Sequence, residues 1–376
     1  MKVLLVSPFS AQRAGGIGTW TKSVLDFAPN DPDTALFFLN TGFGLKRQIK
    51  GRFKTLKRLT IGSLDSSRVL IRLFFAMMIK RPDVVHYTSS AAFALWKDKI
   101  AIFIVRKIFG KHFVIHWHFG RIPEMSKNGT KEYQLFKTVH VMADASIVLD
   151  RFSAEAMCRD GLENVYVVPN AVTQAVYDYS LSLNMATVQK NRSHNKVLFV
   201  GHILKTKGIE ELVQSCVQID GVELIVVGPD LGQLQPSLKA TASQRDGGKW
   251  LTFTGELKRE QVLEYYKSCT LFCLPSYSEG FPYVILESMS CGCPIVATDV
   301  GAIPDMLDGG CGSIVNPKDV DQLKGALTAV LSNHSLRFSM GNIAYQKVMK
   351  EYTIESIYSN YKTIWQKVYD FNRQCI

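Results

Sequence analysis

Short apolar runs that alternate with helical patterns are the feature of this chain that most constrains its fold. Six runs of strand character come before residue 177, and six more come after residue 195. The first six are Val3–Ser7, Ala35–Leu39, Asp83–Tyr87, Phe113–His116, Ala145–Leu149 and Val165–Val168, and the second six are Val197–Val200, Glu223–Val227, Leu251–Phe253, Thr270–Leu274, Pro294–Ala297 and Ser313–Val315. Strands that alternate with helices form parallel sheets with helices on both faces. The predicted fold class is therefore α/β, with two doubly wound, Rossmann-like domains.

The domain boundaries follow from the place where this alternation stops. Polar residues dominate 177–195, which predicts a linker between an N-terminal domain at 1–176 and a C-terminal domain at 196–352. The chain ends in helical patterns, and we expect the last of them, 353–376, to cross back to the N-terminal domain. Sheets of this kind bind ligands at the carboxyl ends of their strands. Two such domains predict a central cleft that both sheets face.

Composition limits the compartments that fit this chain. No apolar run reaches the ~18 residues that a membrane-spanning helix needs. The apolar run after Met1 and Lys2 is too short for the core of a signal peptide, and a strand fits it better. The eight cysteines include no Cys-x-x-Cys pair, which is typical of reduced, buried thiols in a cytosolic protein.

The stretch Ser276–Glu287 carries the clearest chemical pattern. Glu279 and Glu287 stand eight positions apart, where a predicted strand leads into a predicted helix. Pro282 suits the first helical position, because it has no N–H to leave unpaired, and Gly280 permits a sharp turn. The free N–H groups of a helix N-terminus bind anionic oxygens such as phosphate, while carboxylates bind hydroxyls. A ligand that needs both groups at once is a sugar nucleotide.

Together these features resemble retaining glycosyltransferases of the GT-B fold, in glycosyltransferase family four (glycosyl transferases group 1). The resemblance covers nearly the whole chain and is strongest from Val197 to Val315. It is carried by the paired glutamates, by the Glu-Gly-Phe-Pro motif at 279–282 and by the run at 291–301. It implies that Glu287 binds the ribose hydroxyls of the nucleotide and that Glu279 is a catalytic residue beside the transferred sugar. It also implies donor contacts at Gly280, Phe281, Pro282 and Tyr283.

The loop that opens the second domain supplies the expected cations. The resemblance implies an arginine after the first glycine of this loop and a lysine before the second, which neutralise the leaving diphosphate. Lys207 matches the lysine and is our expected catalytic cation, whereas His202 stands in place of the arginine. A guanidinium is always charged, but histidine is half-charged at best near neutral pH. Leaving-group stabilisation is therefore expected from Lys207, from Lys205 or from a protonated His202, and a surface turn without chemistry is the alternative.

In the first domain, Gly15 and Gly16 follow the first strand by a short loop. They match the glycine pair of the family, whose backbone approaches the donor phosphate and the acceptor. A dinucleotide-binding fingerprint fails here, because Thr21 occupies the third glycine position. A plain glycine turn is the alternative interpretation.

Two histidines, His116 and His118, end the fourth predicted strand. Residues two apart on a strand share a face, so both imidazoles could point toward a ligand. The resemblance implies one catalytic histidine here, and we choose His118 before His116. A hydrogen-bonded core histidine is one alternative and a zinc site is another, because His-x-His binds zinc in some hydrolases. No further metal-binding cluster supports zinc, and Asp31-Pro32-Asp33 is interpreted as a turn, so no metal and no other cofactor is expected.

The net charge of +11 is concentrated in one segment, with 16 Lys and Arg against three acids between Lys46 and Lys111. Within it, residues 46–58 place cations around apolar residues at helical spacing. This pattern predicts a basic amphipathic helix on an anionic membrane surface, and a basic loop is the alternative. Nucleic acid is not expected as a partner, because neither aromatic interleaving nor a binding motif accompanies the charge.

The resemblance implies a metal-independent hexosyltransferase that moves a sugar from a nucleoside-diphosphate donor, a UDP-sugar rather than a GDP-sugar, to a saccharide or polyprenyl-linked saccharide. Such a bacterial enzyme of cell-surface polysaccharide or lipopolysaccharide biosynthesis would be cytoplasmic and peripheral on the inner face of the membrane. Two alternatives stay open. A sugar-nucleotide epimerase of the same fold would need acid and base carboxylates in the first domain, where few acids occur. A catalytically silent, membrane-associated nucleotide-sugar binding protein is favoured by the missing arginine.

Overall fold

Two units, each built around its own parallel sheet, make up the protein. The computed structural model describes residues 1–9, 15–42, 54–90, 94–192 and 195–371, with the backbone alone at 54–63 and 371. Unit 1 consists of Met1–Pro169 and Ile354–Ile376, and unit 2 consists of Asn170–Thr353. The first boundary thus lies after Pro169 instead of after residue 176.

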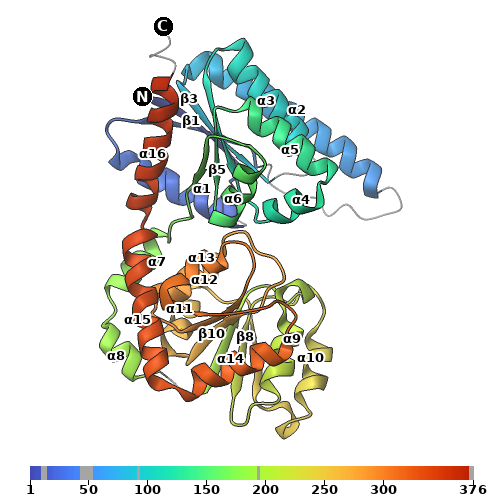
Figure 1. Ribbon diagram of the computed structural model, residues 1–376, viewed down its shortest axis with the longest axis vertical. Coiled ribbons are helices and arrows are strands. Elements are labelled where there is room, and N and C mark those ends of the chain that lie inside the picture. The colour runs from blue at the N-terminus through green and yellow to red at the C-terminus, as the bar shows by residue number, and fades with distance from the viewer. Residues whose placement is uncertain (10–14, 43–53, 91–93, 193–194, 372–376) are drawn as a thin grey trace. The chain divides into compact units, whose positions relative to one another are not determined.

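Unit 1 contains a six-stranded parallel sheet with the order β2-β1-β3-β4-β5-β6 (Figure 1). Its strands are β1 (Lys2–Ser7), β2 (Ala35–Asn40), β3 (Val84–Ser89), β4 (His112–Trp117), β5 (Ala145–Val148) and β6 (Val165–Val167). They match the first six apolar runs with ends shifted by one or two residues. Parallel strands covered on both faces read as continuous apolar runs, which is why the sequence revealed them.

Helices cover both faces of this sheet. They are α1 (Gly16–Phe27), α2 (Lys54–Lys80), α3 (Ala94–Phe103), α4 (Ile122–Asn128), α5 (Lys131–Met142), α6 (Arg151–Arg159) and α16 (Ile354–Phe371), with a π-helical turn η2 (Ile104–Ile108) after α3. Helices α2, α3 and α5 share one apolar core with the sheet, whereas α1 and α16 pack together against the other face (Figure 1).

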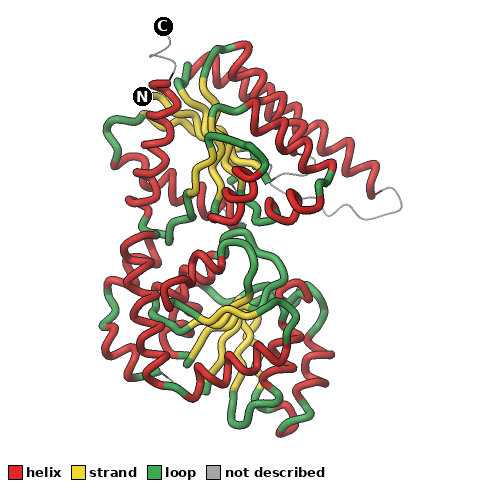
Figure 2. The backbone as a smooth tube through the Cα atoms, viewed as in Figure 1, coloured by secondary structure: helices red, strands yellow, loops and turns green. Residues whose placement is uncertain are grey.

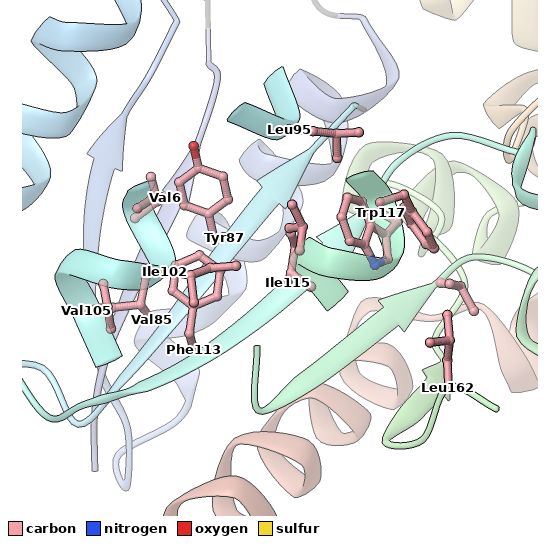
Figure 3. Packing of buried hydrophobic residues seen from close by; sticks show 14 of the residues in the cluster. Val6, Val85, Tyr87, Leu95, Ile102, Val105, Phe113, Ile115, Trp117 and Leu162 are labelled. Carbon is pink, nitrogen blue, oxygen red and sulfur yellow. The ribbon is translucent and has the colours of Figure 1, made fainter. Parts of the chain in front are cut away.

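Strand alternation decides which side chains meet each group of helices. Tyr87, Ile115 and Trp117 point toward α3, where they join a buried apolar cluster that includes Leu95 and Ile102 (Figure 3). Successive residues of a strand point to opposite faces. The residues between them on β3 and β4, including the histidines, therefore face α1 and α16.

Unit 2 contains a second six-stranded parallel sheet, with the order β12-β11-β10-β7-β8-β9. The strands of both sheets are yellow in Figure 2. Its strands are β7 (Lys196–Val200), β8 (Glu223–Val227), β9 (Leu251–Gly255), β10 (Leu271–Leu274), β11 (Ile295–Thr298) and β12 (Ser313–Val315). The strand order reverses between β7 and β10, and open α/β sheets bind their ligands at such a switch point. The prediction of two doubly wound α/β domains is confirmed.

The segment 177–195, expected to be a linker, belongs to unit 2, and most of its described residues lie in two helices, α7 and α8. The helices of this unit are α7 (Gln174–Leu181), α8 (Met185–Lys190), α9 (Ile209–Cys216), α10 (Gln235–Ala242), α11 (Arg259–Ser268), α12 (Tyr283–Ser290), α13 (Ile303–Leu307), α14 (Val320–Ser332) and α15 (His334–Glu351). The buried Arg192 explains the polar composition, because its guanidinium donates to the carbonyls of Tyr266, Cys269 and Cys291 at 2.7–2.9 Å. It satisfies carbonyls at the C-terminal ends of α11 and α12, which those helices cannot pair internally.

Helix α16 is tied to the rest of unit 1 by charge as well as by packing. The Lys362 ammonium donates to the carboxylates of Asp31 at 2.8 Å and Asp33 at 2.7 Å. The Asp-Pro-Asp turn thus binds a cation of the chain's own C-terminal helix. On the same helix, Tyr361 accepts a hydrogen bond from the Trp20 indole at 2.9 Å.

Among the helices that the structure describes, none is both long and apolar enough to cross a membrane. The side chains of residues 46–58, expected to contact a membrane surface, lie outside the described residues. Of the seven cysteines in the described ranges, Cys158 is exposed, contrary to expectation, while the other six are buried and none forms a disulfide.

Candidate active site

Two loops meet at the switch point of the unit 2 sheet, one after β7 and one after β10. The Tyr277 amide donates to the Thr206 carbonyl at 2.9 Å and joins the two loops. Gly208 makes this approach possible: its φ is +66°, and a Cβ there would lie 1.9 Å from the Pro275 carbonyl oxygen. Only glycine fits such a position, so the local sequence fixes the distance between the two loops.

This approach brings together Lys207 and Glu279, two of the three residues predicted to be catalytic. The Lys207 ammonium donates to Glu279 Oε1 at 2.6 Å, and the Ser276 hydroxyl donates to the same oxygen at 2.6 Å. Both side chains of the ion pair are largely buried. Ser276 is a contact that sequence reasoning missed, although it belongs to the loop that the motif identified.

The loop that carries Glu279 is held from its other side by Gly301. A Cβ at Gly301 would lie 2.2 Å from the Glu279 carbonyl oxygen, and the residue has φ +56°. The neighbouring Ala302 amide donates to the Gly280 carbonyl at 3.0 Å. The glycine that closes the 291–301 run therefore shapes the backbone at the paired-glutamate motif.

Helix α12 begins at Tyr283, so Pro282 is its N-cap residue and not its first helical residue. The φ of −75° and ψ of 118° at Pro282 are extended, which places the start of the helix one residue later than expected. Phe281 is buried and packs edge-to-face on Tyr352, with ring centroids 5.9 Å apart. The Phe281 side chain thus anchors the loop in the core, and its backbone is the part available to a ligand.

Glu287 lies in the second turn of α12, where it is only 9% exposed. Its carboxylate is 3.5 Å from the Arg259 guanidinium, at the start of α11. Burial raises the pKa of Glu287 to about 7, and the Arg259 charge opposes that rise. Arg259 is a further residue that sequence reasoning missed, because nothing in the sequence places the start of α11 beside α12.

The other candidate cations of the β7 loop are placed differently. His202 is exposed, and Lys205, which is also exposed, lies 3.7 Å from the Glu210 carboxylate. Of the three cations considered from the sequence, Lys207 is therefore the one that contacts the paired-glutamate loop.

In unit 1, Gly15 and Gly16 form the exposed N-terminal end of helix α1. Gly15 is the N-cap residue, with φ −80°, and no side chain caps the helix there. No described atom lies within 4 Å of a Cβ built at either glycine. Packing of the described residues therefore does not require glycine at these positions.

His116 and His118 lie on one face, as strand periodicity predicted. Their ring centroids are 4.0 Å apart, and both rings contact Trp20 of α1 at 4.8–4.9 Å. Burial lowers the pKa of His118 to about 3 and that of His116 well below its ordinary value, and neighbouring histidines add to both effects. Both imidazoles are therefore neutral at physiological pH.

The proton positions on two buried histidines follow from one tryptophan of α16. The Trp365 indole N–H donates to Nδ1 of His86 at 2.9 Å, and an indole N–H can only donate. His86 must therefore carry its proton on Nε2. That nitrogen is 3.1 Å from Nδ1 of His116, so His86 donates and His116 accepts. His116 in turn carries its proton on Nε2.

The hydrogen bonds from Trp365 to His86 and from His86 to His116 form a relay that does not reach Nε2 of His116 or the neighbouring His118 ring. Nε2 of His116 and Nε2 of His118 are both buried and make no hydrogen bond with any described residue. Buried polar atoms are normally paired, so these two nitrogens mark a place where a partner is missing. The sequence shows a histidine, His86, on the strand that precedes β4. Its contact with His116 could not be predicted, because that contact depends on the register between β3 and β4.

The zinc interpretation finds no support in the described part of the chain. No group of three or more His, Cys, Asp or Glu side chains there is arranged to hold a metal ion.

Comparison with known proteins identifies relatives of part of the chain and of its fold. The family model described as Glycosyl transferases group 1 matches residues 183–347. D-inositol 3-phosphate glycosyltransferase of Mycolicibacterium smegmatis is 29% identical over 177 residues, which cover 42% of this chain and 41% of that protein. The chain thus spans about two fifths of the length of this curated relative.

Solved structures match over almost the whole chain. Sucrose-phosphate synthase from Thermosynechococcus elongatus matches with a TM-score of 0.71 at 18% identity, over 98% of this chain and 99% of that chain. HepE of Anabaena, solved in complex with UDP, matches with a TM-score of 0.69 at 18% identity, over 98% of this chain and 100% of that chain. At such identities a likeness establishes the fold. Residues 183–347 thus match the glycosyl transferases group 1 family, and the chain as a whole has the GT-B fold.

Proposed function

We propose that this protein is a retaining glycosyltransferase of family four, which moves a sugar from a nucleoside-diphosphate donor to a saccharide or lipid-linked saccharide. The observation that carries this proposal is the contact of Lys207 and Ser276 with Glu279 at the switch point of unit 2. It lies beside the N-terminus of α12, within the region that matches the family model. Open α/β sheets bind nucleotides at this place.

Each group of the site has a task in donor binding. Lys207 and the first N–H groups of α12 bind the diphosphate, because a cation and a helix N-terminus both attract phosphate oxygens. Glu287 accepts hydrogen bonds from the ribose hydroxyls, and Glu279 lies beside the transferred sugar. Charge-assisted hydrogen bonds of this kind contribute about 1.5–3 kcal/mol each.

The reaction needs no protein nucleophile. The bond between the anomeric carbon and the diphosphate oxygen breaks, and both electrons leave with the diphosphate, whose charge Lys207 stabilises. The acceptor hydroxyl attacks the oxocarbenium-like sugar from the same face and passes its proton to the departing phosphate oxygen. The protein contributes positioning and fixed charge, and His118 is the third catalytic residue of the proposal, beside Lys207 and Glu279.

UDP-sugars are the proposed donors, and the complex of HepE with UDP supports this choice. We propose that no metal is needed, because Lys207 and the α12 N-terminus supply the positive potential at the diphosphate. The acceptor would be part of a bacterial cell-surface glycan, and the enzyme would act at the cytoplasmic face of the membrane.

The test is incubation with a panel of UDP-, GDP- and ADP-sugars, with and without a chelator, with diphosphate release as the readout. We expect slow release from one UDP-sugar without acceptor, unaffected by the chelator, and Glu287→Ala should weaken UDP binding roughly tenfold to a hundredfold. Donor binding without any release of diphosphate would instead indicate a catalytically silent nucleotide-sugar binding protein. A change of configuration within the donor sugar would indicate an epimerase, and inversion at the anomeric carbon of a product would exclude retention.

His202 provides a separate test of leaving-group stabilisation. If a protonated His202 assists the departing diphosphate, turnover should fall as the pH rises above about 7, because the imidazole then loses its charge. His202→Arg should remove that fall, since a guanidinium stays charged. A flat profile for the unsubstituted protein would assign the task to Lys207.

A further inference from the structure

The described large apolar side chains that are exposed to solvent are concentrated on one part of unit 1. Nine of the seventeen such side chains lie between residues 64 and 108. These nine residues, here called the apolar face, are Leu64, Ile71, Phe75, Met78 and Ile79 on α2, Trp96, Ile100 and Phe103 on α3, and Ile108 on η2. Single exposed apolar residues are ordinary on a protein surface, but contiguous patches mark interaction sites.

Helix α2 is apolar on two opposite sides. Val69, Leu73 and Met77 are buried against the sheet. Ile71 and Phe75, one turn apart, are each more than half exposed. A surface helix of a globular protein presents one apolar stripe to the core and polar residues to water. The second stripe of α2 is therefore not part of the core that the described residues of unit 1 form.

Helix α3 repeats this arrangement beside α2. Leu95 and Ile102 enter the core (Figure 3), whereas Trp96, Ile100 and Phe103 recur at helical spacing on the exposed side. The two helices contact each other and lie side by side on the same face of the sheet (Figure 1). Two neighbouring helices thus each carry an outward apolar stripe.

The charges around the apolar face are positive. Arg68, Arg72, Lys80 and Lys107 are exposed on the same elements. The acids of this part of the chain are all engaged within the protein: Asp65 lies 3.7 Å from Arg68, Asp83 lies 3.8 Å from Lys111 and accepts from the Lys2 amide, and Asp98 is buried beside Ser89. The surface therefore combines exposed apolar side chains with a net positive charge.

We propose that the outward faces of α2 and α3 bind the interfacial region of an anionic lipid bilayer. Apolar side chains enter the boundary between headgroups and acyl chains, and the surrounding cations bind anionic headgroups. Long basic side chains bury their aliphatic stems in the same boundary. This site differs from the basic segment 46–58, because its affinity rests on apolar insertion, and it does not depend on the proposed transferase activity.

Trp96 is a built-in probe of this contact. It is 62% exposed, whereas the other four tryptophans of the chain are at most 6% exposed. Vesicles with about one third phosphatidylglycerol in phosphatidylcholine should shift its emission to shorter wavelength, and brominated acyl chains should quench it. Trp96→Phe should abolish the quenching, because the buried indoles do not reach the lipid.

Sedimentation with the same vesicles measures the affinity. Ile71→Ser with Phe75→Ser and Ile100→Ser should weaken binding at least tenfold, because tenfold corresponds to about 1.4 kcal/mol and the burial of a single apolar side chain supplies that much. The matched control is Leu336→Ser with Phe338→Ser, which removes two exposed apolar residues of α15 in unit 2 and should leave binding unchanged. An unaltered melting temperature and far-UV circular dichroism spectrum would show that the variants are folded.

Several outcomes would overturn the proposal. Equal vesicle binding by the triple variant and the unsubstituted chain would remove the apolar face from the contact, and so would complete loss of binding at about 0.5 M salt, where surface charges are screened. Equal binding to purely zwitterionic vesicles would contradict the role of the cations. Self-association that the triple variant abolishes, without vesicle binding, would assign the face to a second copy of this chain. None of these measurements involves a sugar donor, so a failed donor screen would leave them unaffected.

Discussion

Replacing Glu287 by glutamine should stabilise the unliganded protein at neutral pH while it weakens nucleotide binding. Burial raises the pKa of this carboxyl group to about 7 from an ordinary value of 4.5, and Arg259 at 3.5 Å offsets only part of that effect. The folded protein therefore holds a proton on Glu287 in a pH range where the unfolded chain has lost it. Glutamine has nearly the same shape and no charge to bury.

The size and sign of the effect follow from the two pKa values. A difference of one in pKa corresponds to about 1.4 kcal/mol, so the full penalty for ionising Glu287 in the folded state is about 3 kcal/mol. Stability falls with rising pH wherever the folded state binds more protons than the unfolded state. For Glu287 this range extends from the ordinary pKa to about 7, and above it the penalty is constant. Glu287→Gln should escape the penalty.

The assay is thermal unfolding of both proteins between about pH 5 and pH 8 without nucleotide. The advantage of Glu287→Gln should grow by roughly 2–3 kcal/mol across this range, which for a domain of this size is a rise of roughly 5–10 °C in Tm relative to the unsubstituted protein. Glu260→Gln is the matched control, because it removes an exposed glutamate from the neighbouring helix α11. A difference in Tm that stays constant with pH, or a variant that is less stable at pH 8, would refute this account of Glu287.

Three further predictions concern other contacts of the two units. Lys207→Met should weaken UDP binding tenfold to a hundredfold, as measured by calorimetry, because it removes the cation that contacts Glu279; Lys207→Arg should keep much of the affinity. Trp365→Phe removes the N–H that fixes the histidine tautomers, so the imidazole ¹⁵N shifts of His116 should change, and unchanged shifts would contradict the relay. Gly208→Ala should lower the free energy of unfolding by at least about 2 kcal/mol in urea titrations because of the close carbonyl, whereas Gly325→Ala in the middle of α14, with no atom nearby, should raise it by about 0.5–1 kcal/mol.

The fold was accessible from the sequence because the strands are continuous apolar runs, and the central ones, such as β3 and β10, are buried along their whole length. The strands β8 (Glu223–Val227) and β12 (Ser313–Val315) coincide with the predicted runs residue for residue. Polar composition was a poorer guide at 177–195, where it predicted a linker. A charged residue such as Arg192 is expected at the surface when only the sequence is known. Its burial depends on hydrogen bonds to the carbonyls of Tyr266 and Cys291, which lie far away in the sequence.

The candidate site was accessible only where its residues are neighbours along the chain. The motif at 276–287 identified the loop that carries Glu279, although the contact of Ser276 with Glu279 in that loop was missed. The histidine relay depends on register: Thr88 pairs with His116 across β3 and β4, which places His86 diagonally from His116 on the same face. A slip of one residue would turn a whole strand's side chains to the opposite face, and sequence patterns do not fix register to that accuracy.

Two of the places where the described residues depart from ordinary packing rules point to function without reference to any relative. Glu287 is a buried carboxyl group whose cation lies beyond ideal hydrogen-bond distance, and the histidine pair has two buried nitrogens without partners. Both departures cost stability, and neither is needed to build its sheet, because the apolar residues of the same strands and helices supply the core. Natural sequences depart from these rules mainly at functional sites. A ligand that donates hydroxyls to Glu287, and one that offers an acceptor to the His116 N–H, would relieve both costs, so the binding of such ligands should stabilise each unit separately.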